Sequence, residues 1–124
     1  MDTENIITER IIKCAIEVHR TLGPGLLESI YEECLCKEFD LDGLPYTRQK
    51  ELPIQYKGMV LSEKYRLDLV VNEAVVVELK CVEMILPVHV AQVLTYLKLT
   101  KMKLGLLLNF NTDMMKRGIK RVIL

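Results

Sequence analysis

The sequence predicts an α/β fold in which helices cover a mixed central sheet. Two stretches near the N-terminus repeat apolar residues with a helical period, and the middle of the chain changes to a period of two. A later helical stretch then leads into a continuous apolar run. The predicted order is two helices, three strands, one helix and two strands, in a single domain over residues 1–124.

The first helix is expected over residues 5–22, where "GPG" ends it because proline cannot continue a helix. The second is expected over residues 26–39, followed by the turn "DLDG". The apolar spacing assigns its inner face to Leu27, Ile30, Tyr31, Cys34 and Leu35.

The strands follow from alternation around residues 52–56, 65–71 and 74–80, with turns at "KG" and "NEA". Pro53 predicts that the first strand lies at an edge of the sheet. A third helix begins near Pro87 and extends to about Thr100. The run "LGLLLNF" predicts an inner strand, and "GIKRVIL" predicts a short last strand.

Charge is balanced overall but unevenly distributed along the chain. Lysines plus arginines and acids both number 17, yet the segment from Lys98 to Arg121 carries a net charge of +6. Such a segment favours a positive surface for a polyanion, although a solvated basic edge is the alternative. The polar N-terminus and the lack of a long apolar run lead us to expect a cytoplasmic protein that does not enter membranes.

The four cysteines show no C-x-x-C pairing and lie in apolar stretches. This favours buried free thiols in a reducing compartment over a zinc or redox site.

Charged residues inside the strand "VVVELK" are the most informative feature of the sequence. Glu78 and Lys80 lie two residues apart and so on one face, where they could simply pair with each other. Asp68 is a further carboxylate in the preceding strand. A two-residue loop would place Asp68 and Glu78 on opposite faces, whereas a three-residue loop at Asn72–Ala74, or a bulge, brings them together. We predict one of the latter arrangements.

Two carboxylates on one face would bind a hard divalent cation through oxygen, and Mg²⁺ (or Mn²⁺) suits two carboxylates plus waters. Lys80 would point to the same place, where an ammonium can orient an attacking water and stabilise phosphate charge. This combination fits metal-assisted phosphodiester hydrolysis.

The spacing Asp-x9-Glu-x-Lys resembles the pattern of the PD-(D/E)XK nuclease superfamily, and Gly25-x-x-Glu28-x-x-Tyr31 resembles its prokaryotic GxxExxY branch. The resemblance extends over nearly the whole chain. It implies a restriction-endonuclease-like αβββαβ core with Glu28, Asp68, Glu78 and Lys80 in the active site. Leu67 replaces the proline of the superfamily's name. Taken alone, Glu28 also fits an exposed residue that complements a helix dipole.

On the third helix His89, Gln92 and Tyr96 form one polar stripe. Gln92-x-x-x-Tyr96 resembles the motif of RecB-like exonucleases, which implies roles beside the metal and the nucleic acid backbone. A half-buried tyrosine with a satisfied hydroxyl is the alternative for this pair, and a helix cap is the alternative for His89.

We therefore expect an Mg²⁺-dependent nuclease acting on DNA, with RNA as the second candidate, without strong sequence specificity. Glu28, Asp68, Glu78 and the main-chain carbonyl of Leu79 are the expected metal ligands. The expected substrate contacts are His89, Lys101, Lys103, Lys116 and Arg117. A nuclease fold that only binds nucleic acid or protein is the alternative, and the small size favours a homodimer.

Overall fold

The computed structural model describes residues 3–124. Its helices are α1 (Thr3–Leu22), α2 (Glu28–Asp42), α3 (Pro87–Thr100) and the short 3-10 helix η1 (Met115–Gly118). Its strands are β1 (Tyr46–Tyr56), β2 (Met59–Val71), β3 (Val75–Lys80), β4 (Leu104–Asn109) and β5 (Ile119–Ile123). The predicted order of helices and strands is confirmed.

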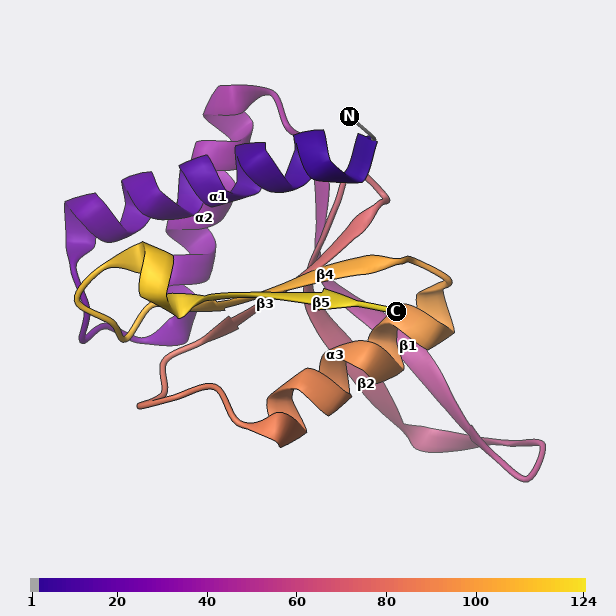
Figure 1. Cartoon of the computed structure of the whole chain (residues 1–124). Helices are drawn as coiled ribbons and strands as arrows, with labels where there is room; N and C mark the ends of the chain where they lie inside the picture. Colours follow the sequence, from indigo (N-terminus) through magenta and orange to yellow (C-terminus); the bar gives the residue numbers. More distant parts are fainter. Residues whose placement is uncertain (1–2) are drawn as a thin grey trace.

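The strands form one mixed sheet in the order β1-β2-β3-β4-β5. Only the β3–β4 pair is parallel, and α3 makes the crossover that a parallel pair requires. Strand β1 lies at an edge, as Pro53 predicted, and every residue of the inner strand β4 is buried. Helices α1 and α2 cover one face of the sheet and α3 covers the other (Figure 1).

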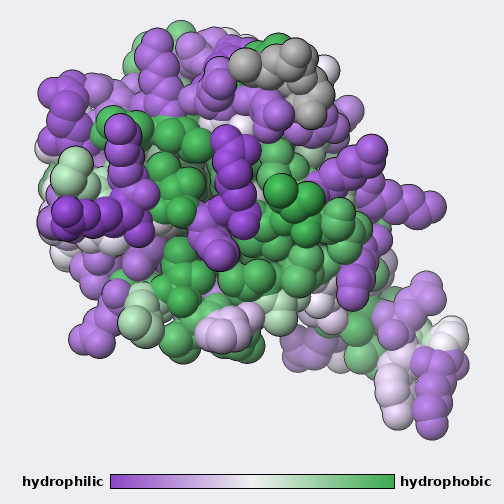
Figure 2. All heavy atoms as spheres, in the orientation of Figure 1, coloured by the Kyte–Doolittle hydropathy of each residue, from purple (hydrophilic) through white to green (hydrophobic). Residues whose placement is uncertain are grey.

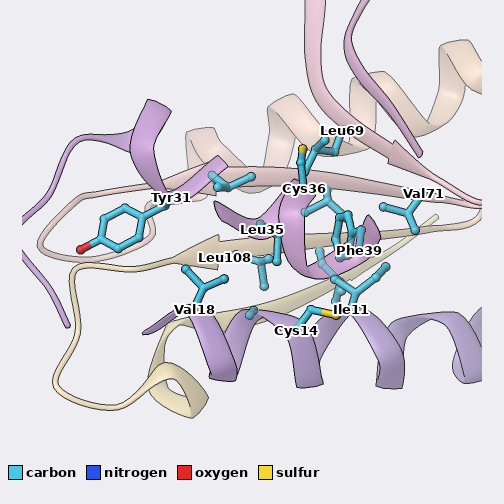
Figure 3. Close-up of a cluster of buried hydrophobic side chains, with 14 of the residues drawn as sticks. Ile11, Cys14, Val18, Tyr31, Leu35, Cys36, Phe39, Leu69, Val71 and Leu108 are labelled. Carbon is cyan, nitrogen blue, oxygen red and sulfur yellow. The ribbon is translucent and has the colours of Figure 1, made fainter. Parts of the chain in front are cut away.

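The larger hydrophobic core lies between the sheet and the α1–α2 pair. Figure 3 shows side chains from both helices converging on strands β2 and β4. Tyr31 stacks on Phe110 with ring centroids 4.6 Å apart, and Ile11 and Phe39 are fully buried. Burial of aromatic and branched side chains of this size supplies most of the stabilisation of a small domain.

The inner face of α2 differs from the sequence prediction. Leu27 is 69% exposed and Ile30 is 41% exposed, whereas Glu32, Cys36 and Phe39 are buried. Leu27 has an extended backbone and precedes the first helical residue, so the helical period begins later than expected. The buried stripe then follows the i, i+4 spacing from Tyr31, and it includes a carboxylate that apolar patterning does not reveal.

At Asp68 the side chains of strand β2 switch from one face of the sheet to the other. Leu69 and Val71 pack in the α1–α2 core, whereas Leu67 packs in the smaller core under α3. Regular alternation would place all three on one face. Beyond this point β1 and β2 continue as a hairpin that projects from the body (Figure 1) and turns at Lys57 and Gly58, which both have positive φ.

The surface view shows a hydrophobic area on the side where β5 forms the outer edge of the sheet (Figure 2), and Ile123 and Leu124 are exposed there. Within residues 3–124 none of the helices combines the length and hydropathy needed to cross a membrane. All four cysteines are free thiols; Cys14 and Cys36 are buried, and Cys34 and Cys81 are half-buried.

Candidate active site

The β2–β3 loop sets the register that the site depends on. Val71 pairs with Val75, so Asn72, Glu73 and Ala74 form a three-residue loop. Asn72 and Glu73 have φ values of 53° and 52°, and the Ala74 N–H donates to the Val71 carbonyl oxygen. The three-residue loop is one of the two arrangements predicted from the sequence, and continuing this register places Asp68 opposite Glu78.

Two reciprocal hydrogen bonds join Asp68 to its neighbours Glu78 and Leu79 on β3. The Asp68 N–H donates to Glu78 Oε2 at 2.7 Å, and the Leu79 N–H donates to Asp68 Oδ2 at 2.9 Å. The backbone pairing of β2 with β3 covers Leu69–Val71 and Val75–Val77, so these side chains take over where it stops. Each carboxylate is therefore oriented by the main chain of the opposite strand.

Burial makes the charge on these carboxylates costly. Glu78 is only 4% exposed, and burial, with the nearby charge of Asp68, raises its pKa to about 8. Burial also raises the pKa of Asp68 above its ordinary value, although the hydrogen bond from Leu79 opposes the shift. Two adjacent buried carboxylates are costly to ionise together. A cation that binds between them offsets this cost, so its binding is favourable.

Lys80 supplies a positive charge at the end of β3, where its side chain is half-buried. Its ammonium lowers the pKa values of both Asp68 and Glu78, which places it electrostatically within the site. The ion pairs formed within residues 3–124 do not include one between Glu78 and Lys80. The simple pairing considered from the sequence is absent from this structure.

Glu28 is the exposed first residue of α2, and its charge raises the pKa values of Asp68 and Cys81. Tyr31 fixes the loop before it, because the Tyr31 hydroxyl donates to the Gly23 carbonyl oxygen at 2.5 Å and accepts from the Leu26 N–H at 3.2 Å. These two contacts fix the loop that leads into α2, where Glu28 is the first residue.

Helix α3 brings Tyr96 to the carboxylates. Burial raises the pKa of Tyr96, and the charges of Glu78 and Asp68 raise it further. Gln92 Nε2 donates to the Tyr96 hydroxyl at 2.9 Å, so the two residues act as one unit. His89 accepts a hydrogen bond from the Leu86 N–H through Nδ1 at 2.9 Å and caps α3, which is the alternative considered for it above.

The basic residues expected to contact substrate fall into two groups. Lys116 and Arg117 lie in η1, which follows the carboxyl end of β4. Lys80 pairs with Asn109 at that same end of the sheet. Lys101 and Lys103 precede the other end of β4 (Figure 1), so the structure does not bring them to the carboxylates.

Sequence patterning missed a network beside Asp68. Glu32 is buried on α2 and accepts hydrogen bonds from Arg48 Nε at 2.6 Å and from Gln49 Nε2 at 2.8 Å. Its charge raises the pKa values of both Asp68 and Glu78. The only signal in the sequence was that Glu32 follows Glu28 by four residues and so lies on the same side of the helix.

Asn109 is a second residue that the sequence did not single out. Its side chain accepts a hydrogen bond from the Val82 N–H at 3.1 Å and donates to the Val82 carbonyl oxygen at 2.8 Å. The segment after Lys80 is therefore fixed to the end of β4.

The carboxylates of the site provide oxygen ligands, which a hard divalent cation requires. Among residues 3–124 no group of three or more His, Cys, Asp or Glu side chains is arranged to hold a metal ion. Two oriented carboxylates fit the smaller demand of Mg²⁺, which keeps several waters and commonly uses one or two protein carboxylates.

A mixed five-stranded sheet with helices on both faces and acidic residues on adjacent central strands defines a protein of the restriction-endonuclease-like class. The sequence model of the PD-(D/E)XK nuclease superfamily matches residues 5–122, and the chain belongs to this superfamily, whose members are generally nucleases that use divalent metals. No curated protein and no solved structure shows significant similarity to the chain.

Proposed function

We propose that this chain is a divalent-metal-dependent nuclease that hydrolyses phosphodiester bonds in DNA without strong sequence specificity. The observation that carries the proposal is the reciprocal bonding of Asp68 with Glu78 and Leu79, with Lys80 and Tyr96 electrostatically coupled to the two carboxylates. Carboxylates alone would repel phosphate, so this arrangement favours chemistry that includes a cation.

Asp68 and Glu78 would hold Mg²⁺ or Mn²⁺, and Glu28 and the Leu79 carbonyl oxygen are the further ligands that we propose. The bound ion would supply Lewis acidity at a phosphate oxygen. Lys80 would orient the attacking water and offset charge on the phosphate, while Gln92 and Tyr96 would position the phosphate group. The water oxygen forms the new P–O bond, the bond to the leaving nucleotide breaks, and a water proton reaches the leaving oxygen through solvent.

Three finer assignments belong to the same proposal. We place the chain in the GxxExxY branch because Gly25, Glu28 and Tyr31 are all present at the motif spacing, and the Tyr31 hydroxyl fixes the loop before α2. We propose a cytoplasmic location, as expected for free thiols. We also propose a homodimer, and the exposed Ile123 and Leu124 on the open edge of β5 offer an apolar surface for it.

The proposal is tested by incubating the purified chain with supercoiled plasmid and with single-stranded DNA, in Mg²⁺, in Mn²⁺ and in a chelator. Cleavage should require the metal and should fall at least about 100-fold in Glu78→Gln and Lys80→Ala, because each removes a group from the reacting centre. Glu17→Gln is the matched control, since Glu17 pairs with Arg20 on the exposed side of α1. Equal cleavage by Glu78→Gln and the wild-type protein would refute the assignment.

A non-catalytic module that binds nucleic acid or protein is the second candidate. It is favoured by the finding that no three His, Cys, Asp or Glu side chains within residues 3–124 are arranged to hold a metal ion. Under this alternative, electrophoretic mobility shifts would appear in every metal without cleavage. The same mobility shifts would appear in Lys80→Ala, because under this alternative Lys80 has no catalytic role.

A further inference from the structure

Strand β1 contains a backbone feature that turns and caps do not explain. Gln49 has φ of 54° in the middle of the strand. The other non-glycine residues with positive φ in residues 3–124 lie in turns or at the end of α3: Lys57, Asn72, Glu73 and Lys101. A left-handed residue inside a strand is strained, and such strain persists only where surrounding contacts impose it.

The strained residue lies beside Asp68. Arg48 pairs with Leu69 and Lys50 pairs with Leu67, so the position between them places Gln49 alongside Asp68. On the other side of Asp68 lies Glu78. The left-handed backbone, Asp68 and Glu78 therefore form one row across β1, β2 and β3. At this row the buried side chains of β2 also switch faces of the sheet, because Leu69 packs in one core and Leu67 packs in the other.

Glu32 supplies the contacts that impose the strain. Gln49 Nε2 donates to Glu32 Oε1 at 2.8 Å and to Oε2 at 3.1 Å, and Arg48 Nε donates to Oε2 at 2.6 Å. Glu32 is only 6% exposed, so its charge depends on these donors. Helix α2 thereby holds two consecutive residues of β1 at the bend.

We propose that Glu32 is a positioning residue of the active site: by binding Gln49 and Arg48 it maintains the left-handed bend in β1 that presents Asp68 to Glu78 and Leu79. Without this link Gln49 relaxes towards extended backbone, β2 straightens, and the two reciprocal hydrogen bonds weaken. Only the consequence for metal binding rests on the proposed function, because the effect on the bend is independent of it.

Amide hydrogen exchange followed by NMR tests the structural step without any metal. The Asp68 and Leu79 N–H groups donate the reciprocal bonds, and Leu106 in β4 reports global opening. In Glu32→Gln the protection of Asp68 and Leu79 should fall about tenfold or more relative to Leu106. Asp42→Asn is the matched control, because Asp42 also ties α2 to another element, through Arg10 at 2.9 Å, away from the bend.

A rescue experiment separates positioning from general destabilisation. Glycine adopts positive φ without strain, so Gln49→Gly should keep the bend and reduce the effect of Glu32→Gln on both amides. Gln49→Val should instead lower their protection, since a β-branched residue strongly disfavours positive φ. Unchanged protection in Glu32→Gln, or an equal loss with and without Gln49→Gly, would overturn the proposal.

Mn²⁺ titration then connects the bend to the site. We expect Glu32→Gln to weaken Mn²⁺ binding about tenfold, as is usual for residues that orient metal ligands, and Gln49→Gly to recover part of the loss. If the wild-type chain binds no Mn²⁺, the proposed function fails while the exchange result still stands. If the wild-type chain and Glu32→Gln bind Mn²⁺ with equal affinity, the positioning role of Glu32 is refuted.

Discussion

Glu78 is the residue whose environment most strongly opposes its own charge. It is held by the Asp68 N–H and surrounded by core residues, and burial together with the Asp68 carboxylate raises its pKa to about 8. The site therefore holds a group that prefers a proton near neutral pH until a cation replaces that proton. In this respect the protein gives up stability at a functional position.

This property predicts a pH-dependent gain in stability for Glu78→Gln. The folded state of the wild-type chain binds a proton more tightly than the unfolded state, so its unfolding free energy falls as pH rises from about 4.5 to about 8. The variant keeps the acceptor oxygen and lacks this loss. Its stability relative to the wild type should rise by roughly 1–3 kcal/mol across that window, measured by urea unfolding.

Glu17→Gln provides the control of opposite sign. The hydrogen bond from Arg20 lowers the pKa of Glu17, so this exposed variant should gain nothing towards high pH. Millimolar Mg²⁺ should raise the melting temperature of the wild-type chain at high pH but not that of Glu78→Gln. A flat difference between variant and wild type over the whole window would contradict the assigned environment of Glu78.

At the level of elements, the end of β4 is packed against η1 without room for a side chain. A Cβ on Gly118 would lie 2.0 Å from the Asn109 carbonyl oxygen, which is backbone. On Gly105 a Cβ would lie 2.7 Å from Val93 Cγ1, which belongs to a side chain. Gly118 is therefore crowded by main chain, and Gly105 most closely by a side chain.

Alanine at these two positions should have unequal effects. Gly118→Ala should destabilise the chain by about 3 kcal/mol or more, because the main chain of Asn109 must shift. Gly105→Ala should lower stability less, by roughly 1–2 kcal/mol, since the crowded atom is a side-chain methyl group rather than main chain. Thermal unfolding measures both. Equal losses would show that backbone crowding at η1 is relieved elsewhere.

The elements that depend on chain pattern could be predicted from the sequence, and those that depend on tertiary contacts could not. Periodicity located the sheet, and the three-residue loop placed Asp68 opposite Glu78. The bend at Gln49 escaped prediction because its cause lies on another element, at Glu32. Glu32 itself was hidden, since a carboxylate in a buried stripe looks like a solvated position until its partners are known.

At the scale of the whole molecule, the candidate active site lies at one end of the sheet, and the basic residues of the last quarter of the chain are divided between both ends. Lys116 and Arg117 follow the carboxyl end of β4, where β3 also ends with Lys80. Lys101 and Lys103 precede the opposite end. A nucleic acid at the carboxylates would therefore meet only part of the positive charge that the sequence places in the last quarter of the chain.

Two paired substitutions test this division. Lys116→Gln with Arg117→Gln should weaken DNA binding and reduce the slope of log affinity against log salt by about 1–2, because each phosphate contact releases counterions. Lys101→Gln with Lys103→Gln removes the same charge at the far end and should leave the slope nearly unchanged. Fluorescence anisotropy over a salt series makes the comparison. Equal slopes in the two variants would mean that DNA does not approach the carboxyl end of β4.

The projecting β1–β2 hairpin divides the proposed active-site residues between two halves of the chain. Its turn at Lys57 and Gly58 separates Glu28, Glu32 and Gln49 from the segment that carries Asp68, Glu78 and Lys80. If the chain were produced as two fragments cut at this turn, neither would hold a complete site. The proposed nuclease activity would then report on reassociation of the halves and would depend on their concentrations, so the hairpin tip is the position at which to split the chain.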